Sequence, residues 1–118
     1  VKRFWGNGDG RFLYPPLQAA VPVSKKHGPV IAPPVPSIRL EMLREGIEDY
    51  EMLYMLRELI EKKRSALSQA ELRRFEQLLQ VPETITKDMT TFTKDPRPIL
   101  EHRAKVAAAI EELLHGNK

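Results

Sequence analysis

Residues 37–64 read SIRLEMLREGIEDYEMLYMLRELIEKKR, and this stretch decides the fold class. It contains one glycine and no proline, and the hydroxyl of Ser37 can cap its first turn, so it predicts one long helix. A helix of about 28 residues would be roughly 42 Å long. Large apolar side chains recur along it at spacings of three and four, which places five of them on one stripe: Leu40, Leu43, Ile47, Tyr50 and Tyr54.

A run of five apolar residues, from Met52 to Leu56, interrupts this pattern. At about 100° per residue, these side chains point to every side of the helix. A helix that is apolar all round is normally surrounded by protein. We therefore expect a further surface, a missing domain or a partner subunit, to cover part of it. The alternative is that the proline-rich segment before Ser37 folds back and completes the cover.

Two shorter helices are expected after the long one. Ser68 and Glu71 have the spacing of a capping box, which predicts a helix over residues 68–80. Asp95 as cap, with Pro96 in the first turn, predicts a third helix over residues 96–115, and Gly116 is a suitable end. The apolar positions of these helices are Leu72, Phe75, Leu79, Ile99, Val106, Ala107, Ile110 and Leu113. Residues 82–94 are expected to form a loop.

Seven of the ten prolines and four of the six glycines precede Ser37. Such a segment cannot run as a regular helix, so residues 1–36 are expected to form an extended arm, with a short strand at residues 11–14. The sequence thus predicts a mainly α chain, with the arm at 1–36 and a helical region at 37–118. The 118 residues suffice for one small domain.

Charge and composition argue against several partners. The net charge is +3, and the five basic side chains of residues 1–36 are too dispersed for the footprint of a nucleic-acid-binding protein. No stretch approaches the roughly 20 apolar residues of a membrane span. Without cysteine there is no disulfide scaffold, thiolate zinc site or cysteine nucleophile. We therefore expect neither nucleic acid nor a membrane as a partner.

Candidate metal sites lack the required ligands. Asn7-Gly8-Asp9-Gly10 is similar to the start of a calcium loop, but Trp5 and Pro16 occupy positions that need carboxylates. A tight turn is the simpler interpretation. The three histidines have no metal-ligand spacing: His27, His102 and His115. We expect no metal and no cofactor.

The adjacent carboxylates Glu48 and Asp49 also give no catalytic pair. Their side chains diverge by about 100° on a helix, so a solvated or dipole-favoured face is expected. Arg44 can pair with Glu48 four residues on. Near the N-terminus, four aromatic residues lie within 14 positions, which suits either a sugar contact or anchoring of a loop in a core: Phe4, Trp5, Phe12 and Tyr14.

Two segments together carry a resemblance to a known family. The first is Gly8-Asp9-Gly10 followed by Leu13-Tyr14-Pro15. The second and more specific is PSIRLEMLREGIEDYE, residues 36–51, and a weaker likeness follows from Asp95-Pro96 through Arg103. This pattern resembles the C-terminal end of glycoside hydrolase family 123-like proteins, a region also catalogued as a domain of unknown function. The resemblance covers most of the chain.

The resemblance implies a (β/α)₈ barrel that hydrolyses β-linked N-acetylhexosamine, above all N-acetylgalactosamine, with the substrate's acetamido oxygen as nucleophile. The family's Asp-Glu pair lies well upstream on a barrel strand. Glu48-Asp49 has the opposite order on a helix, so that role is not transferred. This chain would supply the tail of the last barrel strand, the following loop and the closing helices, without catalytic residues of its own. An extracytoplasmic location is implied.

In such a barrel, loops after strands lie at the substrate-binding face. The resemblance therefore implies that Trp5, Asp9 and Tyr14 lie near a sugar. Four residues of the long helix are expected to tie it to the barrel and to the glycine loop: Arg39, Glu41, Arg44 and Glu48. The main partner is then the barrel domain of the parent chain, with a glycan contact at the arm.

Two alternatives from other classes remain. One is a free-standing helical interaction module that forms a homodimer through its apolar helix. The other is an independent carbohydrate-binding module. The first residue, Val1, is not methionine, so we expect the chain to be a processed or excised piece.

Overall fold

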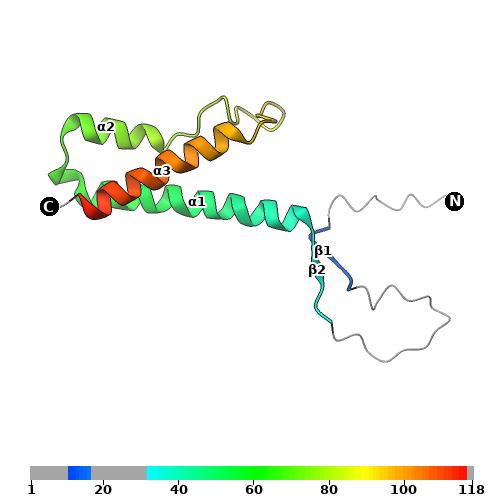
Figure 1. Cartoon of the computed structure of the whole chain (residues 1–118). Coiled ribbons are helices and arrows are strands. Elements are labelled where there is room, and N and C mark those ends of the chain that lie inside the picture. The colour runs from blue at the N-terminus through cyan, green and yellow to red at the C-terminus, as the bar shows by residue number, and fades with distance from the viewer. Residues whose placement is uncertain (1–10, 17–31, 117–118) are drawn as a thin grey trace, which may run out of the picture. The chain divides into compact units, whose positions relative to one another are not determined.

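The computed structural model describes residues 11–16 and 32–116 of the chain (Figure 1). Its elements are β1 (Leu13–Tyr14), β2 (Val35–Pro36), α1 (Ile38–Lys63), a short 3₁₀ turn η2 (Arg64–Ala66), α2 (Gln69–Leu78) and α3 (Arg97–His115). The mainly helical class and the three helices are confirmed. By its internal contacts the chain divides into two compact units, Val1–Ile47 and Glu48–Lys118, and α1 contributes to both. Trp5, Asp9 and the calcium-like segment lie outside the described residues.

In the first unit, β1 and β2 form a two-stranded antiparallel sheet, with Leu13 opposite Pro36 and Tyr14 opposite Val35. The strand expected at residues 11–14 is therefore present as its second half. The pairing strand β2 was not expected, because it lies among prolines that lack an N–H donor. A two-stranded sheet tolerates Pro36, since each strand is an edge.

Ser37 joins this sheet to α1. Its backbone N–H donates to the Phe12 carbonyl at 2.8 Å, and its hydroxyl donates to the Arg11 carbonyl at 3.0 Å. The same hydroxyl accepts from the N–H of Leu40 at 3.3 Å, which confirms the predicted cap. Ser37 is only 3% exposed, so one buried side chain both caps α1 and binds the chain just before β1.

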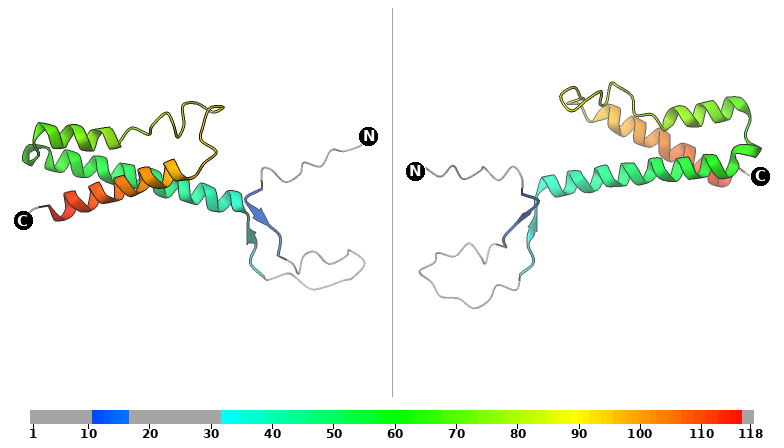
Figure 2. Two further views of the ribbon diagram at one scale, coloured as in Figure 1. Left: turned by 45° about the horizontal axis from the view of Figure 1, so that its top comes forward. Right: turned by 180° about the vertical axis from the view of Figure 1, so that it is seen from behind.

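In the second unit, α2 and α3 pack along the part of α1 that follows Glu48 (Figures 1 and 2). The core lies between the three helices because each contributes a narrow apolar face to it. Six further side chains are partly buried against this core. The buried apolar residues are Leu56 and Ile60 of α1, Leu72 and Phe75 of α2, and Val106, Ala109, Ile110 and Leu113 of α3.

The ends of α1 and α2 are fixed by polar contacts. The ammonium group of Lys63 donates to the carbonyl of Leu113, near the end of α3. The predicted capping box is confirmed: Ser68 accepts from the N–H of Glu71, and the Glu71 carboxylate accepts from the N–H of Ser68 at 2.8 Å. The helix begins at Gln69 rather than Ser68, which is then the cap.

The start of α3 differs by one residue from the prediction. The helix begins at Arg97, so Pro96 rather than Asp95 is the cap residue. The Asp95 carboxylate still accepts a hydrogen bond from the backbone N–H of Arg97 at 3.0 Å, so its side chain caps the first turn of the helix as predicted. Residues 82–94 form turns, as predicted, with one isolated bridge between Thr86 and Phe92. None of the helices in the described part of the chain is both long enough and apolar enough to cross a membrane.

Candidate functional site: an exposed apolar stripe on α1

The apolar stripe that the sequence shows on α1 does not face the core. We define the α1 stripe as Leu43, Ile47, Tyr50 and Tyr54. Their side chains are 47%, 53%, 66% and 49% exposed, respectively. Leu40 extends the stripe and is half-buried. Because α1 is one continuous helix, the spacing of three and four residues is sufficient to place them on one face.

The core uses a different face of the same helix. Leu56 is 0% exposed and Ile60 is 1% exposed. At about 100° per residue, Tyr54 points roughly 160° away from Leu56, so the two side chains lie on different faces of α1. The helix α1 therefore has two apolar faces, and α2 and α3 cover one of them.

In the run from Met52 to Leu56, some side chains face the core and others face solvent. Leu56 is buried, and Met52 and Leu53 are partly buried against the core. Tyr54 and Met55 are 49% and 50% exposed. The described residues thus cover this run only in part.

A shallow groove of about 290 Å³ lies at the second-unit end of the stripe. Its walls are Tyr50, Leu53, Tyr54 and Arg57 of α1, and Leu79 just after α2. The groove combines aromatic and aliphatic surface with one guanidinium at its edge. Such a lining suits an apolar side chain with a polar neighbour.

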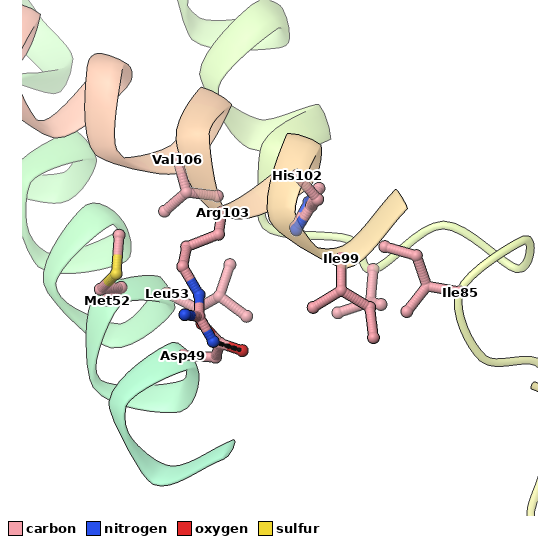
Figure 3. A pocket seen from close by; sticks show the side chains of 9 residues that line it. Asp49, Met52, Leu53, Ile85, Ile99, His102, Arg103 and Val106 are labelled. Atoms are coloured by element: carbon pink, nitrogen blue, oxygen red, sulfur yellow. Dashed lines mark hydrogen bonds and ion pairs between the residues drawn. The ribbon is translucent and has the colours of Figure 1, made fainter. Parts of the chain in front are cut away.

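A second feature is a pocket of about 100 Å³ between α1, α3 and the loop after α2 (Figure 3). Its walls are mainly apolar and include Met52, Leu53, Ile99 and Val106. The exception is an ion pair from α3 to α1, for which Figure 3 shows Arg103 reaching toward Asp49.

The Arg103–Asp49 pair is bidentate. Arg103 Nε donates to Asp49 Oδ1 at 2.5 Å, and Arg103 Nη2 donates to Asp49 Oδ2 at 2.9 Å. The two side chains are 29% and 32% exposed, so the pair is partly shielded from water. The expectation of a solvated face for Asp49 is wrong, because this carboxylate holds α3 against α1.

Chemistry in this pocket is limited by its size and by existing hydrogen bonds. Substrate pockets usually enclose about 300–1,000 Å³, whereas this one has about 100 Å³. His102 Nε2 lies 3.1 Å from the carbonyl of Leu78, so it donates its proton there. Within residues 11–16 and 32–116, three or more His, Asp or Glu side chains are nowhere arranged to hold a metal ion.

The other residues expected at a site are distributed over two elements. Tyr14 lies on β1 and is 41% exposed. Arg39, Glu41, Arg44 and Glu48 all lie on α1. Arg44 and Glu41 form an ion pair at 2.5 Å, three residues apart in the helix.

Sequence reasoning missed the pairing of Arg103 with Asp49, although a signal was present. Arg103 lies four residues after Ile99 and three before Val106, at an apolar position of its helix. Asp49 likewise lies seven residues before the buried Leu56. A charged residue at such a position on each of two helices indicates a buried or half-buried partner.

We compared the chain with protein-family models, with curated proteins and with solved structures, and none matches it. The likeness to family 123-like glycosidases therefore remains a prediction.

Proposed function

We propose that this chain is a helical structural segment of a glycoside hydrolase-like protein, and that the α1 stripe is a protein–protein contact surface. The observation that carries the contact surface is the exposure of four large apolar side chains along one face of a helix. The parent enzyme is supported by the family resemblance described above.

Burial of the stripe would be favourable. Complete burial of a large apolar side chain contributes about 1.5–3 kcal/mol, so covering the exposed half of each stripe residue contributes roughly 1 kcal/mol. Contiguous apolar patches on soluble proteins are commonly interaction sites. Four such residues in a row therefore favour a covered surface over a solvated one.

The shape of this surface favours a macromolecular partner. The α1 stripe lies on the exposed surface of a helix, and the groove beside it is shallow. Small ligands bind in concave sites that bury most of their surface, which a helix face does not provide. A protein surface can cover the whole stripe at once.

The resemblance gives the parent its activity in this proposal. The parent hydrolyses β-linked N-acetylhexosamine outside the cytoplasm, with its catalytic carboxylates upstream of this chain. Trp5, Asp9 and Tyr14 lie near the sugar. Of these, Tyr14 is described, and its 41% exposed ring is open to a sugar face.

Thermal unfolding of the dilute chain tests whether the stripe is a contact surface or a core. We expect Tyr50→Ser to change the free energy of unfolding by less than about 1 kcal/mol, because the side chain is already 66% exposed. Leu56→Ala, six residues further along the same helix, is the matched core control and should cost about 2–5 kcal/mol. Equal costs for the two substitutions would refute the contact surface.

A separate experiment tests the proposal that the chain is a non-catalytic segment of a glycoside hydrolase-like protein. The isolated chain should not hydrolyse a β-linked N-acetylgalactosamine glycoside, whereas a longer chain with the upstream barrel should. Millimolar N-acetylgalactosamine should leave the fluorescence of Trp5, the single tryptophan, unchanged in the isolated chain. A sugar-induced shift there would favour an independent carbohydrate-binding module instead.

A further inference from the structure

We propose that the α1 stripe binds the α1 stripe of a second copy of this chain, with the two helices antiparallel. This inference rests on the proposed contact surface and names its occupant. It requires that the stripes of the two copies fit together when the helices are antiparallel, and that the charged side chains beside them then lie opposite charges of the other sign.

The stripe has the spacing of a coiled-coil seam. Its positions alternate by three and four residues, as the a and d positions of heptads do. This spacing is symmetric about the midpoint between Ile47 and Tyr50. In an antiparallel pair, Ile47 therefore faces Tyr50 of the second copy, Leu43 faces Tyr54 of the second copy, and Leu40 faces Arg57 of the second copy.

The layers combine large with smaller side chains. Tyr54 and Arg57 line the shallow groove at one end of the stripe. The antiparallel register brings Leu40 and Leu43 of the second copy to that groove. Aliphatic side chains thus meet the aromatic wall of the groove twice, once at each end of the two-fold pair.

The charges beside the seam favour the antiparallel orientation. Arg44 and Glu51 occupy equivalent flanking positions one heptad apart, both exposed. The antiparallel register places Arg44 opposite Glu51 of the second copy, and by symmetry this pairing occurs twice. A parallel register instead places Arg39 opposite Arg44 of the second copy, where the charges repel.

The existing contact of Arg44 is compatible with this arrangement. Its guanidinium binds Glu41 of the same helix, and its side chain is 61% exposed. A guanidinium has five N–H donors, so it can bind a carboxylate of the second copy while it keeps contacts within its own helix. Glu51 makes no ion pair with the residues that the structure describes.

The seam is short, which sets the expected strength. From residue 40 to residue 57 a helix rises about 26 Å, or roughly two and a half heptads. Such a seam buries less area than the interfaces of permanent dimers. We therefore expect a reversible dimer whose population rises with concentration.

Sedimentation of the full 118-residue chain, with two charge reversals, tests the inference. Arg44→Glu alone places two glutamates opposite each other, and Glu51→Arg alone places two arginines opposite each other. Each should weaken dimerisation at least about tenfold, since two attractive pairs become repulsive. Mixing the two variants should restore the dimer, because each reversed side chain then faces its opposite. Glu111→Arg on α3, away from the stripe, is the control and should leave the dimer unchanged.

Two results would overturn the inference. One is a wild-type chain that stays monomeric at every concentration. The other is a dimer that both reversals leave intact, or that mixing does not restore. Either result, combined with a harmless Tyr50→Ser substitution, leaves the proposed contact surface standing with a different partner. If Tyr50→Ser instead costs as much as Leu56→Ala, the contact surface itself fails.

Discussion

Arg103 of α3 and Asp49 of α1 are 54 residues apart in the sequence and are joined by two hydrogen bonds, at 2.5 Å and 2.9 Å. The pair closes the second unit at the edge of the small pocket, where Met52, Leu53 and Val106 form the apolar wall. Its position beside the core, and not in open solvent, explains why a charged pair can contribute to the packing of α3 on α1.

A double-mutant cycle should measure this contribution. Asp49→Ala and Arg103→Ala should each lower the free energy of unfolding by about 1–3 kcal/mol, because each removes both half-buried hydrogen bonds between α3 and α1. The double variant should cost less than the sum, with a coupling energy of about 1 kcal/mol. Glu51→Ala, exposed on the same helix, is the control and should change stability by less than about 0.5 kcal/mol. Strictly additive costs would show that the pair does not couple the helices.

Titration of Glu71 should reveal the capping box. Hydrogen bonds from the Ser68 side chain and backbone lower the pKa of Glu71 below its ordinary value. Because the folded state holds the charged form more strongly, this stabilisation is present above about pH 4.5 and is lost as the pH falls through the lowered pKa. In an NMR titration, Ser68→Ala should raise the pKa of Glu71. An unchanged pKa in that variant would contradict the cap.

Leu53→Asp should destabilise the chain. Leu53 is partly buried against the core, and a new carboxylate there lies one turn from Asp49, whose charge repels it. We expect a loss of about 2–4 kcal/mol in denaturant unfolding. Met55→Asp, two positions on and 50% exposed, is the matched control and should cost much less. Unchanged stability of the Leu53 variant would show that this side chain is not covered.

Gly46→Ala should stabilise α1. A Cβ at Gly46 would meet nothing within 4 Å, so alanine gains helix propensity without a clash. The expected gain is about 0.5–1 kcal/mol, seen as a higher midpoint of thermal unfolding. Gly116→Ala is the contrast, since a Cβ there would lie 2.4 Å from the carbonyl oxygen of Glu112. A gain at position 116 and none at 46 would reverse this interpretation.

Local signals in the sequence were sufficient for the helices and their ends. The hydroxyls of Ser37 and Ser68 act as caps where the pattern indicated. Five of the predicted apolar positions lie in the buried core, namely Leu72, Phe75, Val106, Ile110 and Leu113, whereas Ala109 rather than the predicted Ala107 is the buried alanine of α3. These features depend on residues within one or two turns of each other. For that reason spacing alone could predict them.

Spacing alone could not predict whether the α1 stripe faces the core or the solvent. Periodicity shows that Ile47, Tyr50 and Tyr54 share a face, but it does not show which face α2 and α3 will cover. That choice depends on the second apolar face, at Leu56 and Ile60. The sequence did not reveal this face, because the apolar run from Met52 to Leu56 points to every side of the helix. The Arg103–Asp49 pair and strand β2 likewise depend on contacts between distant residues.

Hydroxyl-radical footprinting over a range of chain concentrations tests the central claim most directly, since it measures whether the α1 stripe is open to solvent. In the dilute chain, Tyr50 and Tyr54 should be modified while the buried Phe75 is protected, and both tyrosines should become protected as the concentration rises. Tyrosines already protected in the dilute chain would contradict an exposed stripe. Tyrosines that remain modified at every concentration would contradict its pairing with a second copy.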